Sequence, residues 1–229
     1  MSKKANYGID APGVVLGFAL VGTIGLALAI FLSWWWLTLG AWGCWTAISM
    51  LRGSLHGKFV VRDRLLDGLA IEGAEKILDV GCGRGLLLLS AAKRLTTGKA
   101  VGVDIWQTKD QSGNKPETTL RNATLEGVSD KIELKTADAR KLPFEDASFD
   151  AVISSLAIHN LPDAAGRADV IREIVRVLKP GGKLAIYDIF YTDDYVKSLT
   201  KLGLAEIRLS GRLNVFYKDA MLTAVKPAP

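Results

Sequence analysis

The chain begins with one long hydrophobic segment. Residues 11–51 carry no charged side chain, and three tryptophans stand in a row at Trp34–Trp36. A membrane-spanning helix needs roughly 20 apolar residues, and a straight helix over this whole segment would be about 60 Å long, roughly twice the hydrocarbon thickness. Because tryptophan favours the membrane interface, we expect a hairpin of two transmembrane helices at residues 12–32 and 35–51, with the turn at Ser33–Trp36.

Three other interpretations of this segment stay open at this stage. A single span followed by a tryptophan-rich interfacial helix has the same composition. A cleaved signal peptide would use Lys3, Lys4 and the small-residue pattern Ala27-Leu28-Ala29, although the apolar run exceeds the usual length of about 7–15 residues. A buried hairpin in a soluble protein would need a large core around helices that are apolar on all sides.

Beyond residue 52 the pattern changes to short apolar runs that alternate with amphipathic stretches. Residues 53–75 have the spacing of an amphipathic helix, with apolar residues at Leu55, Phe59, Leu66 and Leu69. Strands are expected at 76–80, 99–105, 131–138, 149–156 and 182–189, helices at 86–95, 116–127, 163–178 and near 193–202, and a closing strand pair at 204–210 and 217–225. This βαβ repetition predicts an α/β fold, a mostly parallel, doubly wound sheet covered on both faces. We expect two domains, a membrane hairpin over 1–52 and an α/β domain over 53–229.

The distribution of charge separates the two parts. The net charge is +5, but residues 1–64 hold six basic and two acidic residues, whereas the remaining 165 residues hold 23 basic and 22 acidic ones. A nearly neutral α/β domain argues against nucleic-acid binding, and basic residues on both sides of an apolar segment are typical of cytoplasmic flanks. The two cysteines, Cys44 and Cys82, form neither a disulfide framework nor a metal set.

A glycine-rich turn follows the first expected strand, in the sequence Asp79-Val80-Gly81-Cys82-Gly83-Arg84-Gly85. Glycines let a backbone turn tightly and approach a ligand. A dinucleotide site requires G-x-G-x-x-G, and here the third glycine comes one residue early, which argues against pyrophosphate. Asp104 ends the second expected strand, where a carboxylate can accept hydrogen bonds from nucleoside ribose hydroxyls.

Four segments in this order resemble the class I S-adenosylmethionine-dependent methyltransferases. They are D-x-G-x-G-x-G at 79–85, the acidic strand end at Asp104, "DARKLPFEDASFD" at 138–150 and "VLKPGGKL" at 177–184. The chain is most similar to the branch with the ubiquinone and menaquinone C-methyltransferases, over roughly residues 70–190. The resemblance implies a seven-stranded sheet with a final antiparallel strand, and S-adenosylmethionine as cofactor.

By position, the resemblance also implies a set of cofactor-binding residues. Gly81 and Gly83 would approach the methionine moiety, in a turn that Asp79 supports and that includes Cys82 and Gly85. Asp104 would hold the ribose and Ile105 would pack on adenine. Asp138 with Ala139 would meet the adenine amine, and Ser154 with Ser155 would lie beside the sulfonium.

Candidate catalytic residues follow the fourth expected strand. His159 and Asn160 stand at the carboxyl edge, where open α/β sheets bind ligands. His159 can act as a base near neutral pH, and a purely structural histidine is the alternative. Asp188, at the end of the fifth strand, is a weaker candidate. The polar loop Trp106–Thr118 departs from the quinone enzymes and either shapes the pocket or is solvated.

Together these features predict a membrane-anchored methyltransferase with its catalytic domain on the cytoplasmic side and a lipophilic small molecule as methyl acceptor. A membrane-addressed enzyme for a soluble thiol, amine or hydroxy acid is one alternative. A non-catalytic nucleoside-binding scaffold is another. No metal is expected, the lipid bilayer is the expected partner, and the sequence does not indicate the acceptor atom or the oligomeric state.

Overall fold

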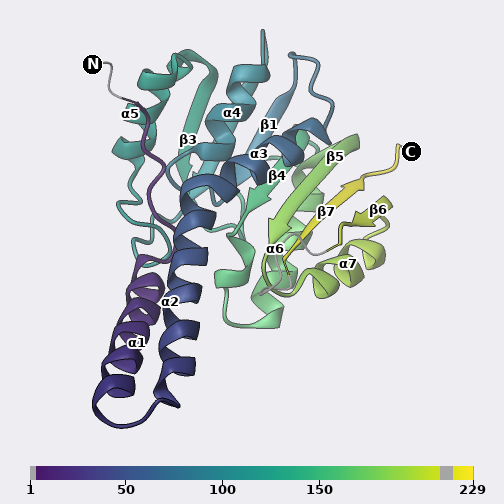
Figure 1. The fold of residues 1–229 in the computed structure, drawn as a ribbon. Helices are drawn as coiled ribbons and strands as arrows, with labels where there is room; N and C mark the ends of the chain where they lie inside the picture. Colours follow the sequence, from purple (N-terminus) through teal and green to yellow (C-terminus); the bar gives the residue numbers. More distant parts are fainter. Residues whose placement is uncertain (1–3, 212–218, 229) are drawn as a thin grey trace. The chain divides into compact units, whose positions relative to one another are not determined.

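The computed structural model describes residues 4–211 and 219–228, and its elements largely follow the predicted alternation (Figure 1). The helices are α1 (Pro12–Phe31), α2 (Trp36–Arg52), α3 (Lys58–Asp67), α4 (Leu86–Arg94), α5 (Pro116–Glu126), α6 (Ala164–Val177) and α7 (Thr192–Lys201). The strands are β1 (Lys76–Val80), β2 (Lys99–Asp104), β3 (Ile132–Thr136), β4 (Phe149–Ser155), β5 (Leu178–Asp188), β6 (Ala205–Leu209) and β7 (Ala220–Val225). Short π and 3-10 turns occur at Gly53–Gly57, Ser129–Lys131 and Ile158–Asn160.

The described chain forms two compact units. One contains the sheet and its helices. The other contains residues 8–60 and 107–114. Asn6 and Tyr7 belong to the sheet unit, where the Asn6 N–H donates to Asn122 Oδ1 over 3.1 Å and the Tyr7 hydroxyl donates to Glu126 Oε1 over 3.0 Å. A division into domains at residue 52 stays a prediction.

Seven strands form one sheet in the order β3-β2-β1-β4-β5-β7-β6. Neighbours from β3 through β5 pair in parallel, and β7 is antiparallel to both β5 and β6. This confirms the predicted doubly wound sheet with a final antiparallel strand. The chain moves outward from β1 to β3 and then returns to β4 on the other side of β1. The carboxyl ends of β1 and β4 therefore mark the topological switch point, the place at which such sheets bind ligands.

Both faces of the sheet are buried, as the continuous apolar strands predict. Alternate residues of β1 point to opposite faces: Leu78 and Val80 pack with α6 and α7, and Ile77 packs with α3 and α4. Asp79 lies on the same side of the sheet as Ile77, so its carboxyl group points into the apolar layer between the sheet and the helices.

The segment before β1 is less regular than predicted. A single helix was expected over residues 53–75, but a π-helix occupies Gly53–Gly57 and α3 ends at Asp67. Two glycines weaken the α-helix here, and the Ser54 hydroxyl exchanges hydrogen bonds of 3.0 Å with the Asp10 backbone N–H and carboxylate.

The boundary between α6 and β5 also differs from the prediction. The helix ends at Val177, and β5 begins at Leu178 rather than at residue 182, so it includes Pro180-Gly181-Gly182. Backbone hydrogen bonds from Gly181 N to Lys226 O (2.7 Å) and from Lys226 N to Gly182 O (2.9 Å) replace the pairing that proline cannot provide. For the last predicted strand, residues 217 and 218 lie outside the described residues.

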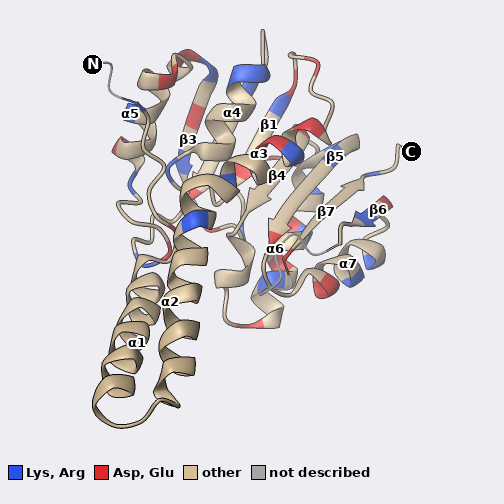
Figure 2. Ribbon diagram, viewed as in Figure 1, with Lys and Arg blue, Asp and Glu red and all other residues tan. Residues whose placement is uncertain are grey.

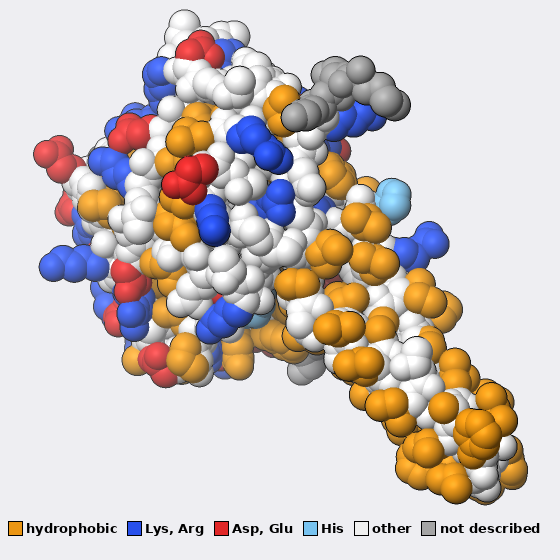
Figure 3. Space-filling view, turned by 90° about the vertical axis from the view of Figure 1, so that its left-hand side faces the viewer, with side chains coloured by type: hydrophobic (Ala, Val, Ile, Leu, Met, Phe, Trp, Pro, Cys, Tyr) orange, Lys and Arg blue, Asp and Glu red, His pale blue; other side chains and the backbone are white. Residues whose placement is uncertain are grey.

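In the second unit, α1 and α2 form a hairpin whose turn spans Leu32–Trp35, close to the predicted position (Figure 1). The helices approach at glycines: a Cβ on Gly25 would lie 2.6 Å from Gly40 N, and one on Gly43 would lie 2.5 Å from Gly22 N. No charge interrupts the hairpin before Arg52 (Figure 2), and its surface is covered with hydrophobic side chains (Figure 3). By length and composition, α1 is the one described helix that qualifies as a candidate membrane span.

Candidate active site

The glycine-rich turn after β1 uses its amide groups internally. Gly81 N–H and Cys82 N–H both donate to Val103 O, over 2.8 and 3.1 Å, and Gly85 N–H donates to Cys82 O over 2.8 Å. Gly83 N–H donates to Asp104 Oδ2 over 2.8 Å. A pyrophosphate site needs such N–H groups free for phosphate oxygens. Because four of them are already bonded, the turn suits a ligand that packs against the backbone better than an anion.

The turn is also closely packed, so its glycines cannot be replaced freely. Gly81 has φ +75°, and a Cβ there would lie only 2.2 Å from Ala157 Cβ, in the segment after β4. Gly85 has φ +85°, and its Cβ would lie 2.8 Å from Thr119 Cγ2 on α5. The Thr119 hydroxyl donates to Gly83 O over 2.7 Å. Neighbouring elements therefore fix the turn on two sides.

Asp79 is a buried carboxyl group with one oxygen unused. It is 1% exposed, and its Oδ2 has no hydrogen-bond partner. Burial, and secondly the charge of Asp104, raise the pKa of Asp79 to about 8, partly offset by a hydrogen bond from the Leu88 backbone. A buried polar atom without a partner is costly. A cationic ligand at this edge would lower that cost, which fits the positive charge of S-adenosylmethionine.

Asp104 ends β2 and is fixed by two backbone groups. Besides the bond from Gly83, its Oδ1 accepts the Trp106 N–H over 2.6 Å. Carboxylate oxygens have further lone pairs, so Asp104 can still accept ribose hydroxyls. Ile105 is 54% exposed beside it. An exposed isoleucine at a strand end is not a core residue, and it can cover an adenine ring.

Asp138 and Ala139 follow β3 in the loop where the resemblance places them. Asp138 is half-exposed and forms an ion pair with Arg140, Oδ2 to Nη2 over 2.6 Å. This pair holds the pKa of the Asp138 carboxyl below its usual value. Ala139 packs on the apolar core. An adenine amine at this loop would find an ionised acceptor whose position Arg140 sets.

Two residues of the predicted set, Ser154 and Cys82, face inward. Ser154 is fully buried, and its hydroxyl donates to Val80 O over 2.8 Å, which ties β4 to β1. Cys82 is 6% exposed and packs with the core on the α4 side, and burial raises the pKa of its thiol. Their side chains support the turn from behind. Ser155, which is partly exposed, is the member of its pair that reaches the edge.

His159 forms a dyad with Asp188. The fully buried Asp188 contacts His159 Nδ1 through Oδ1, and its Oδ2 accepts the His159 backbone N–H over 3.1 Å and the Tyr195 hydroxyl over 3.2 Å. A donor at Nδ1 leaves the lone pair on Nε2. Asn160 is exposed and its amide lies 3.4 Å from Leu156 O.

Sequence reasoning ranked Asp188 below His159 and did not include Tyr195. An acidic residue at a strand's carboxyl end was the available signal for Asp188, as it was for Asp104. Tyr195 lies on α7 and carried no motif. Two exposed aromatic residues, Phe190 and Tyr191, follow one residue after Asp188, and the Phe190 ring centroid lies 6.2 Å from that of His159.

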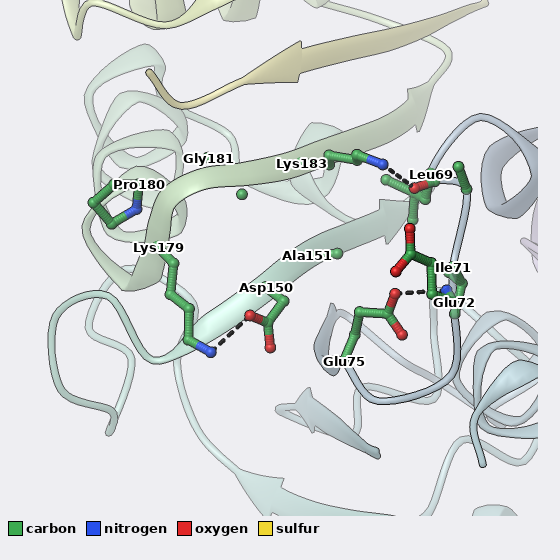
Figure 4. A pocket seen from close by; sticks show the side chains of 12 residues that line it. Leu69, Ile71, Glu72, Glu75, Asp150, Ala151, Lys179, Pro180, Gly181 and Lys183 are labelled. Atoms are coloured by element: carbon green, nitrogen blue, oxygen red, sulfur yellow. Dashed lines mark hydrogen bonds and ion pairs between the residues drawn. The ribbon is translucent and has the colours of Figure 1, made fainter. Parts of the chain in front are cut away.

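A separate hollow of about 240 Å³ lies at the opposite edge of the sheet, near the amino ends of β1 and β4 (Figure 4). Its two lysines are engaged with the protein: Lys179 Nζ pairs with Asp150 Oδ1 over 2.7 Å, and Lys183 Nζ donates to Leu69 O over 2.8 Å. Parallel sheets bind ligands at their carboxyl ends. This hollow is therefore not the cofactor site.

Comparison with known proteins identifies the kind of domain that carries this edge. Residues 78–186, which run from β1 into β5, match the family described as "Methyltransferase domain". This segment is a methyltransferase domain of the S-adenosylmethionine-dependent type. The predicted enzyme class and cofactor are thereby confirmed. The unused Asp79 oxygen and the closely packed glycine turn fit that cofactor, while the individual contacts stay predictions.

Curated relatives include enzymes named for lipophilic molecules. The methyltransferase is 38% identical over 120 residues to the sterol 4-C-methyltransferase strm-1 of Caenorhabditis elegans, a match that covers 52% of this chain and 33% of that protein. It is 34% identical over 145 residues to the demethylmenaquinone methyltransferase of Lactobacillus johnsonii, which covers 62% of this chain and 54% of that protein. The chain thus spans about half or less of these relatives' length.

A solved structure with the same fold is the [4+2]-cyclase SpnF, with a TM-score of 0.62, 20% identity and coverage of 75% of this chain and 81% of that one. At this identity the similarity concerns the fold alone. Its title names a cyclase, so the substrate and reaction of the present methyltransferase have to be argued from its own site.

Proposed function

We propose that this methyltransferase is anchored in a membrane by the α1–α2 hairpin and transfers the methyl group of S-adenosylmethionine to a lipophilic or membrane-partitioned small molecule. The observation that carries the proposal is the meeting of Asp79, the 81–85 turn and Asp104 at the carboxyl ends of β1 and β2, with the His159–Asp188 dyad following β4 and β5. The names of the sterol and menaquinone relatives support the lipophilic acceptor.

In this proposal the residues after β1, β2 and β3 hold the cofactor. The backbone of Gly81 and Gly83 packs on its methionine part, Asp79 faces its positive charge, and Asp104 accepts hydrogen bonds from its ribose. Ile105 covers the adenine and Asp138 accepts from its amine. When bound, the cofactor supplies an electrophilic methyl group on a positively charged sulfur.

The protein's own work is then to position the acceptor and to remove its proton. Correct orientation of two reactants can lower a barrier by roughly 7–11 kcal/mol. The proton of the acceptor passes to His159 Nε2, because Asp188 holds Nδ1 on the other side of the ring. Asp188 is a positioning residue, since it is fully buried and its carboxylate is bonded to His159, to the Tyr195 hydroxyl and to the Ile189 N–H.

The membrane anchor is supported by the length and polarity of the hairpin. At 1.5 Å per residue, α1 (20 residues) and α2 (17 residues) are about 30 and 26 Å long, close to the hydrocarbon thickness. Threonine hydroxyls within them donate to backbone carbonyls nearby in the chain: Thr23 donates to Leu20 O over 3.0 Å and Thr46 to Trp42 O over 2.8 Å. Backbone and side-chain polar groups satisfied in this way tolerate lipid.

The test of catalysis uses full-length protein purified in detergent, methyl-labelled cofactor and a membrane lipid extract. We expect label in an organic-soluble product, and loss of that product with Asp104→Ala. Label found only in water-soluble molecules would overturn the lipophilic acceptor and favour the soluble one. Binding of the cofactor without label in either fraction, for any extract, would favour a non-catalytic scaffold.

The test of anchoring is separate. Ser33 lies in the hairpin turn, so a Ser33→Cys variant in which Cys44 and Cys82 are replaced by alanine carries a single thiol there. We expect the protein to stay in membranes during alkaline extraction, and the thiol to react with a membrane-impermeant maleimide only from the face opposite the catalytic domain. Release by alkali would contradict the anchor.

A further inference from the structure

Arg167 is a buried cation that the protein itself uses only in part. It lies in the first turns of α6 and is 7% exposed. Its Nη1 donates to Leu161 O over 2.8 Å, and its guanidinium carbon stands 3.6 Å from the centroid of the Tyr191 ring. Within residues 4–211 and 219–228, no carboxylate lies within ion-pair distance of it, whereas Arg172 and Arg176 on the same helix pair with Asp169 and Glu173.

This arrangement is unusual in energetic terms. A guanidinium has five N–H donors in a planar fork that matches carboxylate and phosphate oxygens. Burial of a charge is strongly unfavourable unless a partner compensates it. Stacking on Tyr191 and one carbonyl satisfy part of the group. The remaining donors are available to an oxyanion from outside the protein.

The surroundings of Arg167 connect it to the proposed active site. Tyr191 and Phe190 are each 44% exposed, and their ring centroids lie 6.1 Å apart. Phe190 in turn contacts the ring of His159 edge-on. We call these four residues, His159, Arg167, Phe190 and Tyr191, the acceptor cluster. It combines a base, an exposed aromatic surface and a buried cation at the carboxyl ends of β4 and β5.

The backbone supports a functional interpretation of the acceptor cluster. Tyr191 adopts the left-handed conformation, with φ +62°, and so does Leu156 after β4, with φ +53°. Residues other than glycine adopt this conformation only at an energetic cost. Strained residues of this kind gather at ligand sites. In this conformation the Tyr191 ring lies against the Arg167 guanidinium.

We propose that Arg167 recognises an oxyanion of the methyl acceptor, a carboxylate or a phosphate, and that the apolar body of the same molecule packs on Phe190 and Tyr191. This rests on the proposed function and narrows it, because the acceptor becomes an amphiphile with a negatively charged end. Arg167 is a specificity residue in this account, and the base remains His159.

A purely internal role for Arg167 makes a different prediction. The Tyr195 hydroxyl bonds to the buried Asp188, and the Arg167 charge acts on Tyr195 as well. If Arg167 served only to compensate the negative charge of Asp188, its replacement would lower the free energy of unfolding and perturb the His159–Asp188 contact. The wild-type protein would then bind anionic and neutral ligands with equal affinity.

The experiment measures binding of three matched probes to full-length protein in phosphatidylcholine nanodiscs saturated with S-adenosylhomocysteine. The probes are naphthalene-2-carboxylate, 2-naphthyl phosphate and the neutral naphthalene-2-carboxamide, with empty nanodiscs subtracted. We expect the wild type to bind both anions at least about tenfold more tightly than the carboxamide. Arg167→Gln should abolish this ratio, and Arg167→Lys should reduce it, because lysine keeps the charge but not the fork.

The matched control is Arg172→Gln on the same helix, whose side chain is 63% exposed and which should keep the wild-type ratio. Equal binding of the three probes by the wild type, or an unchanged ratio in Arg167→Gln, would overturn the proposal. Should Arg167→Gln not fold, the wild-type ratio and its decrease in Arg167→Lys decide. Nanodiscs that also contain phosphatidic acid distinguish a lipid oxyanion from a soluble one. Weaker binding of the naphthyl anions in these nanodiscs indicates that a membrane lipid competes for the site, and unchanged binding indicates a soluble acceptor. In either case the preference for anions over the carboxamide should persist. S-adenosylhomocysteine binding is measured first, and its absence in the wild type counts against the proposed function instead.

Discussion

Replacement of Gly81 by alanine tests whether the packing of the glycine turn is part of the cofactor site. The new Cβ would meet Ala157 Cβ at 2.2 Å, at a backbone φ of +75°. The left-handed conformation costs an alanine about 1–2 kcal/mol. Optimal carbon contacts lie at about 3.5–4.0 Å, so the turn or Ala157 must also move by more than about 1 Å, and such overpacking costs about 1–3 kcal/mol. The total expected loss of stability is about 2–5 kcal/mol.

Two further variants separate these contributions. Gly181 has nearly the same φ, +76°, with open space around its Cβ position, so Gly181→Ala should show only the conformational cost. In the double variant Gly81→Ala/Ala157→Gly the methyl clash is removed, and the nearest remaining atom, the Cα of residue 157, lies 3.6 Å away. Its stability should approach that of Gly181→Ala.

The assay combines denaturant unfolding with calorimetric titration of S-adenosylhomocysteine. Because the turn lies where the methionine part is proposed to pack, Gly81→Ala should weaken binding at least about tenfold, a loss of 1.4 kcal/mol or more. The double variant should recover most of it, and Gly181→Ala should bind as the wild type does. Wild-type affinity in a folded Gly81→Ala variant would refute the reasoning, because it would separate the turn from the cofactor.

Three other predictions follow from the site and the hairpin. The pKa of Asp79, raised to about 8, leaves this carboxyl mostly neutral at pH 7, whereas the positive charge of S-adenosylmethionine favours its ionised form. The affinity for S-adenosylmethionine, measured by calorimetry, should therefore rise with pH by up to about tenfold per unit and level off above about pH 8. In Asp79→Asn this pH dependence should vanish, and a wild-type profile that is flat would contradict it. His159→Gln should lower turnover about 10²-fold or more without changing cofactor affinity, since a positioned base contributes about 10²–10⁴-fold; equal losses of both would indicate a structural histidine. Gly25→Leu should separate α1 from α2, because its Cβ would lie 2.6 Å from Gly40 N, whereas the Cβ of the control Gly17→Leu meets nothing within 4 Å. The yield of crosslinks between engineered cysteines on the two helices measures the separation. Equal yields in both variants would argue against close packing of the helices.

Much of the fold could be predicted because its signals are local. Apolar runs and glycine turns mark β1 and β2 to within about a residue, and the missing charges mark α1 and α2. The start of β5 at Leu178 could not be predicted, since Pro180 and two glycines suggest a break. The ladder there is completed by Lys226, which is far away in sequence.

The candidate cofactor residues are predicted from motifs, whereas their hydrogen bonds and burial required the structure. The pattern around Gly81 did not reveal that its amides are already bonded, or that Ser154 points inward. Arg167 looked like any charged residue on an amphipathic helix. Its burial against Tyr191 depends on the turn after β5, and no local sequence rule encodes that contact.

The polar loop after β2 also received its role from distant residues. Gln111 pairs with Asp10 as an isolated bridge, and Ile9 N–H donates to the Ser112 hydroxyl over 3.0 Å. Ala11 N–H donates to Asp110 O over 2.9 Å. The loop is therefore bound to the segment that precedes α1, an option that sequence reasoning did not consider.

The central claim is that the carboxyl edge beside Asp79 and Asp104 binds S-adenosylmethionine. Titration of full-length, folded protein with S-adenosylhomocysteine tests it most directly, with Asp104→Ala as the paired variant. We predict saturable one-to-one binding by the wild type and at least about a tenfold loss in the variant, as expected for removal of a charged hydrogen-bond acceptor. Absence of binding to folded wild-type protein, or equal affinity in the variant, would contradict the account.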